Sequence, residues 1–302
     1  MNEIFFQHLQ KITGTEQCFA EEAMRDHTTF RVGGCAEYYV RPKRTQVADI
    51  LSLCRTYDVP WMVIGNGSNL LVGDGGIRGL VMELGREAAE VAVEGNRIKA
   101  QAGALLSAVA RIAASHSLTG MEFASGIPGT VGGAVVMNAG AYGGEMKQIV
   151  KKVTVLTSEG TEKELYSEKL DFGYRHSCIA EHQYVVLDTE LELKPGSQQE
   201  IEGRMAELRS QRSSKQPLEY PSAGSTFKRP EGYFAGKLIQ DAGLRGYRVG
   251  DAQVSEKHCG FVINRGQATA AEIRQLILDV QDRVEAQFGV RLETEVRFLG
   301  EF

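Results

Sequence analysis

SGIPGTVGGAVVMNAGAYGGE, residues 125–145, is the most distinctive stretch of this sequence, and eight of the 25 residues from Gly120 to Gly144 are glycine. Its segment Gly-Ile-Pro-Gly-Thr (126–130) comes just before an apolar run with helical spacing. Backbone N–H groups and the positive end of a helix dipole can therefore face a phosphate there. The alternative, which the residues alone leave open, is a tight turn at a close-packed helix corner.

A second glycine-rich segment, VIGNGSNLLVG (63–73), begins at the end of a predicted buried strand, WMVI (61–64). A turn of small residues can point several backbone N–H groups at one anion and lets the anion approach without a Cβ in the way. Two long loops of this kind in one chain favour a cofactor that carries a diphosphate.

Several familiar nucleotide and catalytic motifs are absent. The run from Gly65 to Gly67 lacks the third glycine of a dinucleotide-binding motif, because residue 70 is leucine. The sequence contains neither a phosphate-binding GxxxxGK[ST] loop nor a GxSxG nucleophile motif. The histidines and cysteines show no spacing typical of a metal site, so no metal is expected.

Composition and charge limit the class of protein. The chain has 302 residues, 42% hydrophobic and 24% charged, and a net charge of −5 without a basic tract, which disfavours nucleic-acid binding. Five cysteines, an odd number without a CxxC pair, favour a reducing compartment. The start of the sequence does not resemble a signal peptide, and no segment resembles a membrane span. We therefore expect a soluble cytoplasmic protein without a membrane partner.

Apolar spacing predicts alternating helices and strands, which is typical of an α+β protein rather than an all-β sandwich. A polar, charged segment at 194–217 predicts a helix at a domain boundary, so we expect domains at 1–194 and 195–302. The helix expected at 45–58 would be capped by Thr45. The expected helices are 3–13, 45–58, 104–117, 194–217, 233–242 and 269–288, and the main expected strands are 61–64, 151–157, 161–166, 184–193, 260–263 and 292–300.

Seven blocks, in order, resemble the UDP-N-acetylenolpyruvoylglucosamine reductases, also called UDP-N-acetylmuramate dehydrogenases, which act in peptidoglycan precursor synthesis. The resemblance covers about residues 25–302. It implies a two-part FAD-binding unit of the vanillyl-alcohol-oxidase type (about 1–95 and 96–194) and an α+β substrate-binding domain (195–302). The blocks are HTTFRVGG, GNGSNLLV, EFASGIPGTVGGAVVMNAGAYGGE, DFGYRHS, SAGSTFKRP, AGLRGYRVGDAQVSEKHCGFVINRG and LETEVRFLG.

The resemblance also implies the chemistry. In this family NADPH reduces FAD, and the flavin passes hydride to the vinyl carbon of an enolpyruvyl ether on a UDP-sugar. Arg175 matches the arginine that binds the carboxylate on which charge grows, because a guanidinium fork suits that group. Ser225 matches the proton donor, and Glu295 matches the carboxyl group beside the enolate-like intermediate.

The glycine loops would then cradle the FAD pyrophosphate, and the absence of histidine from them argues against covalent attachment of the flavin. Lys215 and Arg229 match substrate contacts. The sequence resembles the shorter form of the family, which lacks an extra tyrosine-bearing loop, and it does not reveal the oligomeric state. The implied cofactor contacts are Gly65, Asn66, Gly67, Ser68, Asn69, Ser125, Gly126, Pro128, Gly129, Thr130, Gly132, Gly133, Asn138 and Gly140.

Two other functions are compatible with the same fold. One is a flavin oxidase that uses O₂ as the electron acceptor, and the other is a non-catalytic protein that binds flavin or a sugar nucleotide. The blocks that carry Ser225 and Glu295 disfavour the oxidase. The joint presence of Arg175, Ser225 and Glu295 disfavours the non-catalytic protein.

Overall fold

The computed structural model describes residues 2–302 and divides the chain into two compact units, each with its own hydrophobic core. The first unit comprises Met1–Ala20, Tyr38–Asn66 and Gly79–Arg212, and the second comprises Glu21–Glu37, Gly67–Arg78 and Ser213–Phe302. The division differs from the consecutive segments 1–194 and 195–302 expected from the sequence. The change of composition at 194 marks a short strand, β14 (Lys194–Pro195), which is followed by helix α6 (Gln198–Lys215). Two earlier segments of the chain, Glu21–Glu37 and Gly67–Arg78, join the second unit.

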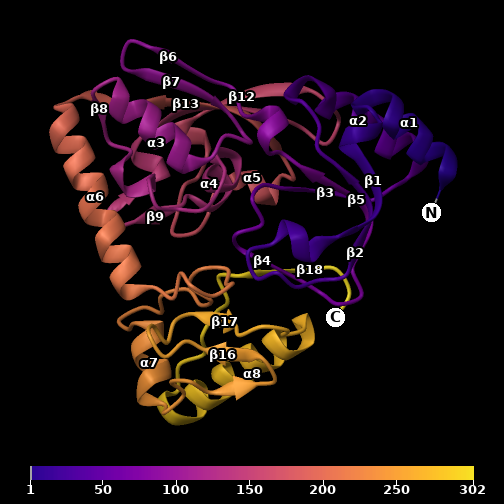
Figure 1. Ribbon diagram of the computed structural model, residues 1–302. Helices are drawn as coiled ribbons and strands as arrows, with labels where there is room; N and C mark the ends of the chain where they lie inside the picture. Colours follow the sequence, from indigo (N-terminus) through magenta and orange to yellow (C-terminus); the bar gives the residue numbers. More distant parts are fainter. Residues whose placement is uncertain (1) are drawn as a thin grey trace. The chain divides into compact units, whose positions relative to one another are not determined.

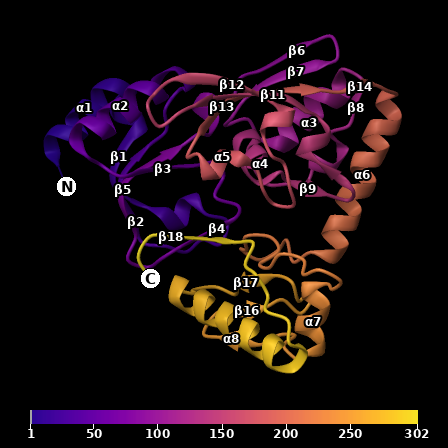
Figure 2. The same ribbon diagram turned by 180° about the vertical axis from the view of Figure 1, so that it is seen from behind.

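A four-stranded sheet and two helices form the N-terminal part of the fold. Helix α1 (Glu3–Thr13) is capped by the Asn2 side chain, and the apolar residues of α1 and α2 (Val47–Tyr57) pack into the first core. The two helices lie side by side in both ribbon views (Figures 1 and 2). The sheet has the strand order β1 (Cys18–Ala23), β2 (Cys35–Val40), β5 (Ile77–Glu83), β3 (Trp61–Ile64), with β3 parallel to β5.

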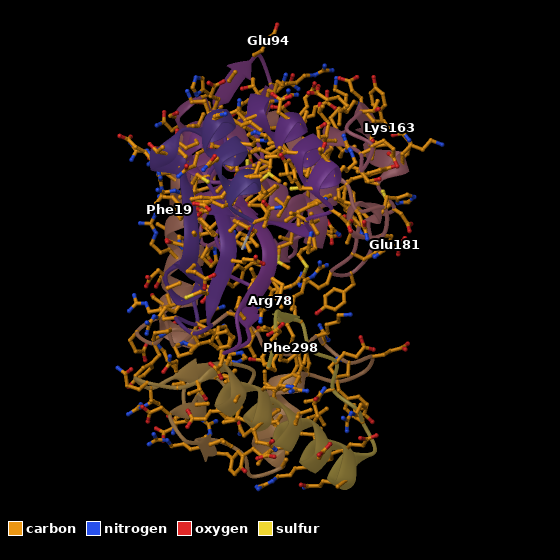
Figure 3. The ribbon with its side chains drawn as sticks, turned by 90° about the vertical axis from the view of Figure 1, so that its right-hand side faces the viewer. Phe19, Arg78, Glu94, Lys163, Glu181 and Phe298 are labelled. Carbon is orange, nitrogen blue, oxygen red and sulfur yellow. The ribbon has the colours of Figure 1, made fainter. Side chains whose placement is uncertain are left out.

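A five-stranded antiparallel sheet forms the rest of the first unit. Helices α3 (Leu106–Ser115) and α4 (Val131–Met137) lie along it (Figures 1 and 2), and both contribute to the same core. The hairpin of edge strand β6 (Val91–Glu94) and its neighbour β7 (Arg97–Gln101) turns just after Glu94, whose side chain points away from the sheet in Figure 3. The strand order is β12 (Glu162–Tyr166), β11 (Val150–Leu156), β13 (Val185–Glu192), β7 (Arg97–Gln101), β6 (Val91–Glu94).

The second unit has a smaller sheet packed with two helices. Strands β15 (Arg248–Val249), β16 (Ala252–Val254) and β17 (Val262–Asn264) are antiparallel, and α7 (Ala235–Asp241) and α8 (Ala270–Phe288) share their core. Two further strands, β4 (Leu70–Val72) and β18 (Arg297–Leu299), pair in parallel although they lie far apart in the sequence.

Two sets of side chains accept hydrogen bonds from the backbone N–H groups at the N-terminus of α8 (Ala270–Phe288). Thr269 and Glu272 form a reciprocal capping box, and the Asp74 carboxylate accepts hydrogen bonds from the backbone N–H groups of Ala270 and Ala271, both at 2.9 Å. Since the first four N–H groups of a helix have no partner within it, these contacts fix where α8 begins.

Most expected elements are present, but two local expectations are wrong. Helix α2 begins at Val47 after Gln46, and no side chain caps it, because Thr45 lies in the short 3₁₀ turn Arg44–Gln46. The last strand is shorter than 292–300, because Thr294 instead makes an isolated bridge with Phe227. Within residues 2–302 no helix is long and apolar enough to cross a membrane.

Arg44 joins the turn before α2 to the five-stranded sheet. Its guanidinium donates to both carboxylate oxygens of Glu162, at 2.7 and 2.8 Å, and to Asp188 at 3.0 Å. This hydrogen bonding lowers the pKa of the Glu162 carboxyl. The Asp188 side chain is only 7% exposed, so its charge depends on Arg44 for compensation.

Replacing Arg44 by methionine should therefore lower the free energy of unfolding by about 2–4 kcal/mol, because the buried Asp188 carboxylate loses its partner. Urea denaturation measures this loss. Arg78→Met removes an Arg–Glu pair whose side chains are 75% and 54% exposed, and it should leave the stability unchanged. Equal losses of unfolding free energy in the two variants would show that the burial of Asp188 does not make the Arg44 pair more important than an exposed pair.

Candidate functional site

The two glycine-rich segments meet in the first unit. The Asn66 side chain donates a hydrogen bond to the carbonyl oxygen of Pro128 at 2.8 Å. A Cβ added at Gly65 would lie 2.2 Å from the hydroxyl oxygen of Thr130, so only glycine permits this approach. The end of β3 and the segment before α4 thus form one backbone-lined surface, as expected if both loops hold one ligand.

Within the second loop, the glycines differ in what surrounds them. Thr130 caps α4 by accepting from the N–H of Gly133, and Gly132 packs against Ala102, where a Cβ would lie 2.9 Å away. Gly133 is exposed, and an added Cβ would meet only the Thr130 hydroxyl, at 3.5 Å. Protein packing therefore explains Gly132 but not Gly133, which leaves an opening that a side chain would fill.

The rest of the first loop belongs to the second unit. Gly67 has φ +58°, and an added Cβ would lie 1.9 Å from the backbone oxygen of His27. Substitution of Gly67 would therefore disturb packing whether or not a ligand binds. The Asn69 side chain donates to the carbonyl oxygen of Glu295 at 3.0 Å, which ties this loop to a predicted catalytic residue.

A residue that sequence reasoning did not single out lies beside this loop. The Thr29 hydroxyl oxygen is buried without a hydrogen-bond partner among residues 2–302, and the Thr29 N–H donates to the carbonyl oxygen of Gly67 at 3.3 Å. A buried hydroxyl without a partner is costly unless a ligand completes it. In the sequence, only its place in the block HTTFRVGG could have pointed to Thr29 as a ligand contact.

Asn138 holds three loops together. It ends α4 with φ +43°, is fully buried, and donates to the carbonyl oxygen of Gly173 at 2.9 Å and to the carboxylate of Glu145 at 3.0 Å. Its side-chain oxygen accepts from the N–H of Lys147. These bonds occupy the amide, so Asn138 positions its neighbours, and its contact with a cofactor stays a prediction.

Arg175 lies at the tip of a tight turn closed by a two-way backbone bridge between Gly173 and His176. Its φ of +56° is a conformation that non-glycine residues adopt at a cost of about 1–3 kcal/mol, most often at functional sites. The half-buried guanidinium lies 5.1 Å from the centroid of the Tyr174 ring. Asn138 fixes this turn through Gly173.

Thr226, which follows Ser225 in the sequence, joins that segment to Glu295 within the second unit. The backbone oxygen of buried Thr226 accepts from the N–H of Glu295 at 2.8 Å, and its N–H donates to Gly260 at 2.8 Å. The Thr226 hydroxyl accepts from the N–H of Val262. Ser225 is exposed and Glu295 is half-buried, so both lie at the surface of one rigid corner. Arg175 belongs to the other unit.

The predicted substrate residues are exposed side chains of the second unit. Lys215 is the last residue of α6 (Gln198–Lys215). Arg229 donates to the carbonyl oxygen of Tyr233 at 3.2 Å, and its guanidinium lies 4.0 Å from the centroid of the exposed Phe234 ring. This contact holds Arg229 over an aromatic surface while the charge stays accessible.

The two histidines near these segments have structural partners. His258 accepts from the N–H of Gly260 through Nδ1 at 3.1 Å, and burial lowers its pKa, which favours the neutral ring. His176 lies 3.3 Å from Asp171. Within residues 2–302, no three His, Cys, Asp or Glu side chains are grouped as metal ligands.

Comparisons with known proteins agree with this arrangement. A family profile described as the C-terminal domain of UDP-N-acetylenolpyruvoylglucosamine reductase matches residues 216–299, and one described as an FAD binding domain matches residues 36–166. The UDP-N-acetylenolpyruvoylglucosamine reductase of Agathobacter rectalis is 54% identical over 314 residues, and 100% of each chain is covered. This chain belongs to the UDP-N-acetylenolpyruvoylglucosamine reductase family.

Solved structures show the same relationship. The family's reductase from Thermus caldophilus has a TM-score of 0.79 and 37% identity, covering 94% of this chain and 98% of that one. An alkyldihydroxyacetonephosphate synthase, 14% identical with a TM-score of 0.50 over 65% of this chain and 41% of its own, shares only the fold. These likenesses confirm the expected α+β class with a flavoprotein domain of the vanillyl-alcohol-oxidase type.

The chain thus carries an FAD-binding domain, and its two loops suit this cofactor. Neither Gly65–Asn69 nor Ser125–Gly133 contains an acidic side chain, and both offer backbone N–H groups and hydroxyls, the donors that a pyrophosphate accepts. The opening at Gly133 and the unpaired hydroxyl of Thr29 are two features of these segments that protein packing alone does not explain.

Gly133→Ala should weaken FAD binding by about tenfold or more, because its methyl group fills the opening that the cofactor needs. The apoprotein should melt at the same or a higher temperature, since alanine favours helix over glycine by about 1 kcal/mol. Fluorescence titration of apoprotein with FAD and thermal melting measure the two effects.

Gly203 in α6 provides the matched control, because an added Cβ there has nothing within 4 Å. Gly203→Ala should leave FAD affinity unchanged. Unchanged affinity in Gly133→Ala as well would mean that the opening does not face the cofactor.

Proposed function

We propose that this protein is a cytoplasmic FAD enzyme that uses NADPH to reduce UDP-N-acetylglucosamine enolpyruvate to UDP-N-acetylmuramate in peptidoglycan precursor synthesis. The observation that supports this proposal is the corner at Thr226, which follows Ser225 in the sequence and whose backbone oxygen accepts from the N–H of Glu295 at 2.8 Å. Full-length identity of 54% to a named reductase supports the same reaction.

The bound FAD supplies a hydride acceptor and donor between NADPH and the vinyl carbon of the substrate. The two glycine loops hold the FAD. They meet where Gly65 packs against Thr130 and where the Asn66 side chain donates to the carbonyl oxygen of Pro128. Because these contacts are backbone-rich and noncovalent, the flavin should leave the protein on denaturation. The NADPH preference rests on family membership.

Arg175 binds the substrate carboxylate. When hydride reaches the vinyl methylene carbon, negative charge spreads from the neighbouring carbon onto this carboxylate as an enolate-like intermediate. A guanidinium fork stabilises that charge as it grows, because both of its N–H groups can donate to the two oxygens. The fixed turn from Gly173 to His176 keeps the guanidinium from reorganising during the step.

Ser225 protonates the carbon next to the new methyl group. Its hydroxyl gives the proton, and the exposed position on a rigid backbone lets it approach the substrate. Glu295, on the neighbouring segment, either holds a proton itself or orients a proton donor beside the intermediate. Lys215 and Arg229 bind polar groups of the UDP-sugar, for which their exposed cationic side chains are suited.

The structure between Arg175 and Ser225 agrees with the shorter form of the family. This stretch is built from α5 (Cys178–Glu181), β13, β14 (Lys194–Pro195) and α6. No added tyrosine-bearing loop interrupts these described elements. Closure of the substrate site therefore depends on side chains other than those of such a loop.

Ser225→Ala should leave reduction of the flavin by NADPH nearly unchanged and slow its reoxidation by substrate on the order of 10²–10⁴-fold, because only the second step needs a proton donor. Rapid-mixing absorbance at the flavin band follows each step. Ser225→Cys should retain more activity than Ser225→Ala, since a thiol still donates a proton.

Loss of the NADPH step in Ser225→Ala, with reoxidation by substrate preserved, would contradict this role of Ser225. Oxygen uptake as fast as substrate reduction would instead favour a flavin oxidase. Bound flavin that substrate never reoxidises, even in the unmodified protein, would favour the non-catalytic protein.

A further inference from the structure

Ser177 stands at the start of a helix without capping it. It is the N-cap residue of α5, a position where a serine side chain usually accepts a hydrogen bond from a backbone N–H of the first helical turn. Here the side chain makes no such bond, although it is only 1% exposed. Its hydroxyl instead donates to the carbonyl oxygen of Val136, in the last turn of α4, at 2.9 Å. A contact between distant segments thus takes the place of a local cap.

This contact completes the C-terminal end of α4. The last four carbonyls of a helix have no partner within it. Those of the two residues before Val136 accept from the backbone N–H groups of Asn138 and Ala139, which follow the helix. The Val136 carbonyl accepts from the Ser177 hydroxyl. Because a buried acceptor is costly to leave without its donor, the bond ties Ser177 firmly to the helix end.

A second hydrogen bond joins the same helix end to the other side of the Arg175 turn. The fully buried side chain of Asn138, the residue that ends α4, donates to the Gly173 carbonyl at 2.9 Å. Gly173 comes before Arg175 in the sequence and Ser177 comes after it. The end of α4 therefore holds the turn on both sides of Arg175. In both ribbon views α4 and α5 lie side by side (Figures 1 and 2).

The backbone of Arg175 has a conformation that needs such support. Its φ of +56° lies in the left-handed region, where a non-glycine residue persists only if the surrounding structure over-determines it. The backbone bridge between Gly173 and His176 closes the turn, but both residues belong to the turn itself. Anchors outside the turn are needed to fix its direction, and Asn138 and Ser177 supply one on each side.

We propose that Ser177 is a positioning residue for Arg175: together with Asn138 it clamps the turn to α4 and so fixes the direction of the guanidinium. This inference rests on the proposed function only in taking the substrate carboxylate as the ligand of Arg175. A donor that stabilises growing charge must be in place before the charge appears, because reorganisation during the step would offset the stabilisation. Ser177 thereby acts on the reaction without touching the substrate.

Ser177→Ala removes the hydroxyl and little else, so its first effect should be local. We expect the N–H groups of Gly173 and His176, which close the turn, to exchange with solvent about tenfold faster. Amide hydrogen exchange of the purified protein measures this change. Thr13→Val is the matched control, because the buried Thr13 hydroxyl also donates to a helical carbonyl, that of Leu9 at 3.0 Å. It should leave exchange in the turn unchanged.

The second effect should fall on one step of the reaction. Ser177→Ala should change reduction of the flavin by NADPH less than about twofold and slow its reoxidation by substrate about 10–100-fold, because a displacement of about 1 Å can cost a hundredfold in rate. In an Arg175→Ala background the same change should slow reoxidation less than about twofold, since a residue that acts through the guanidinium has no effect once it is gone. Rapid-mixing absorbance gives both rates, and Thr13→Val should alter neither.

Ser177→Cys tests the same bond with a weaker donor. Because a thiol donates less strongly than a hydroxyl, this variant should fall between the unmodified protein and Ser177→Ala in both exchange and reoxidation. If Ser177→Ala does not fold, Ser177→Cys carries the test. Its reoxidation should then be slowed when Arg175 is present and unchanged in the Arg175→Ala background.

Two results would overturn the proposal. Unchanged exchange of the turn in Ser177→Ala would mean that the hydroxyl does not hold it. Equal slowing of both steps, or equal slowing of reoxidation with and without the Arg175 guanidinium, would make Ser177 a residue of the fold only. Failure of substrate to reoxidise the flavin of the unmodified protein would instead contradict the proposed function, and amide exchange would still decide whether the clamp exists.

Discussion

The contact between Gly65 and Thr130 is the constraint on which the first unit depends. Here the end of a strand meets the residue that caps α4, and a Cβ at Gly65 would overlap the Thr130 hydroxyl. The four-stranded sheet and the five-stranded sheet share one core beneath this contact. A side chain at this point would separate the loops, so glycine at residue 65 is what lets the two predicted cofactor-binding segments meet.

Buried polar residues, rather than long helices or strands, position the segments that carry the predicted catalytic residues. Asn138 fixes the Arg175 turn, and Thr226 fixes Ser225 next to Glu295, in each case through hydrogen bonds that use nearly all of the residue's polar atoms. A fully satisfied buried network is rigid, since each lost bond would leave a costly unpaired group. The predicted catalytic residues Arg175, Ser225 and Glu295 lie on the segments that these residues hold, and none of the three is fully buried.

The sequence predicts what is local. The apolar spacing of α1 and α8 gives their bounds within a residue or two, whereas the Thr269–Glu272 capping box is not among the predictions. The glycine loops and the family blocks indicate where the cofactor and the catalytic residues lie. Thr45 fails as a cap because a 3₁₀ turn, set by Arg44 and its distant carboxylates, takes its place.

What the sequence does not predict depends on contacts between distant segments. The role of Asn138 requires knowledge of Gly173, and the shortened last strand requires knowledge of Phe227. The sequence does indicate that Arg212 lies on the buried face of α6, because it follows Leu208 at the spacing of the buried residues of that helix. Only the structure shows that its side chain packs against Gly126. Tertiary contacts thus separate glycines that protein packing explains, such as Gly132, from those that it leaves unexplained, such as Gly133.

The capping of α8 by Asp74 bears on the order in which the protein takes shape during synthesis. Strand β4 and Asp74 leave the ribosome long before their partners β18 and α8, because the largest segment of the first unit, Gly79–Arg212, is encoded between them. The second unit therefore closes only after α8 and β18 have been synthesised, and until then the residues of β4 lack this partner strand. Such late, long-range closure slows folding and exposes the nascent chain to association. A fragment that begins at Ser213 would lack both the strand and the cap, so this unit is not a separable module.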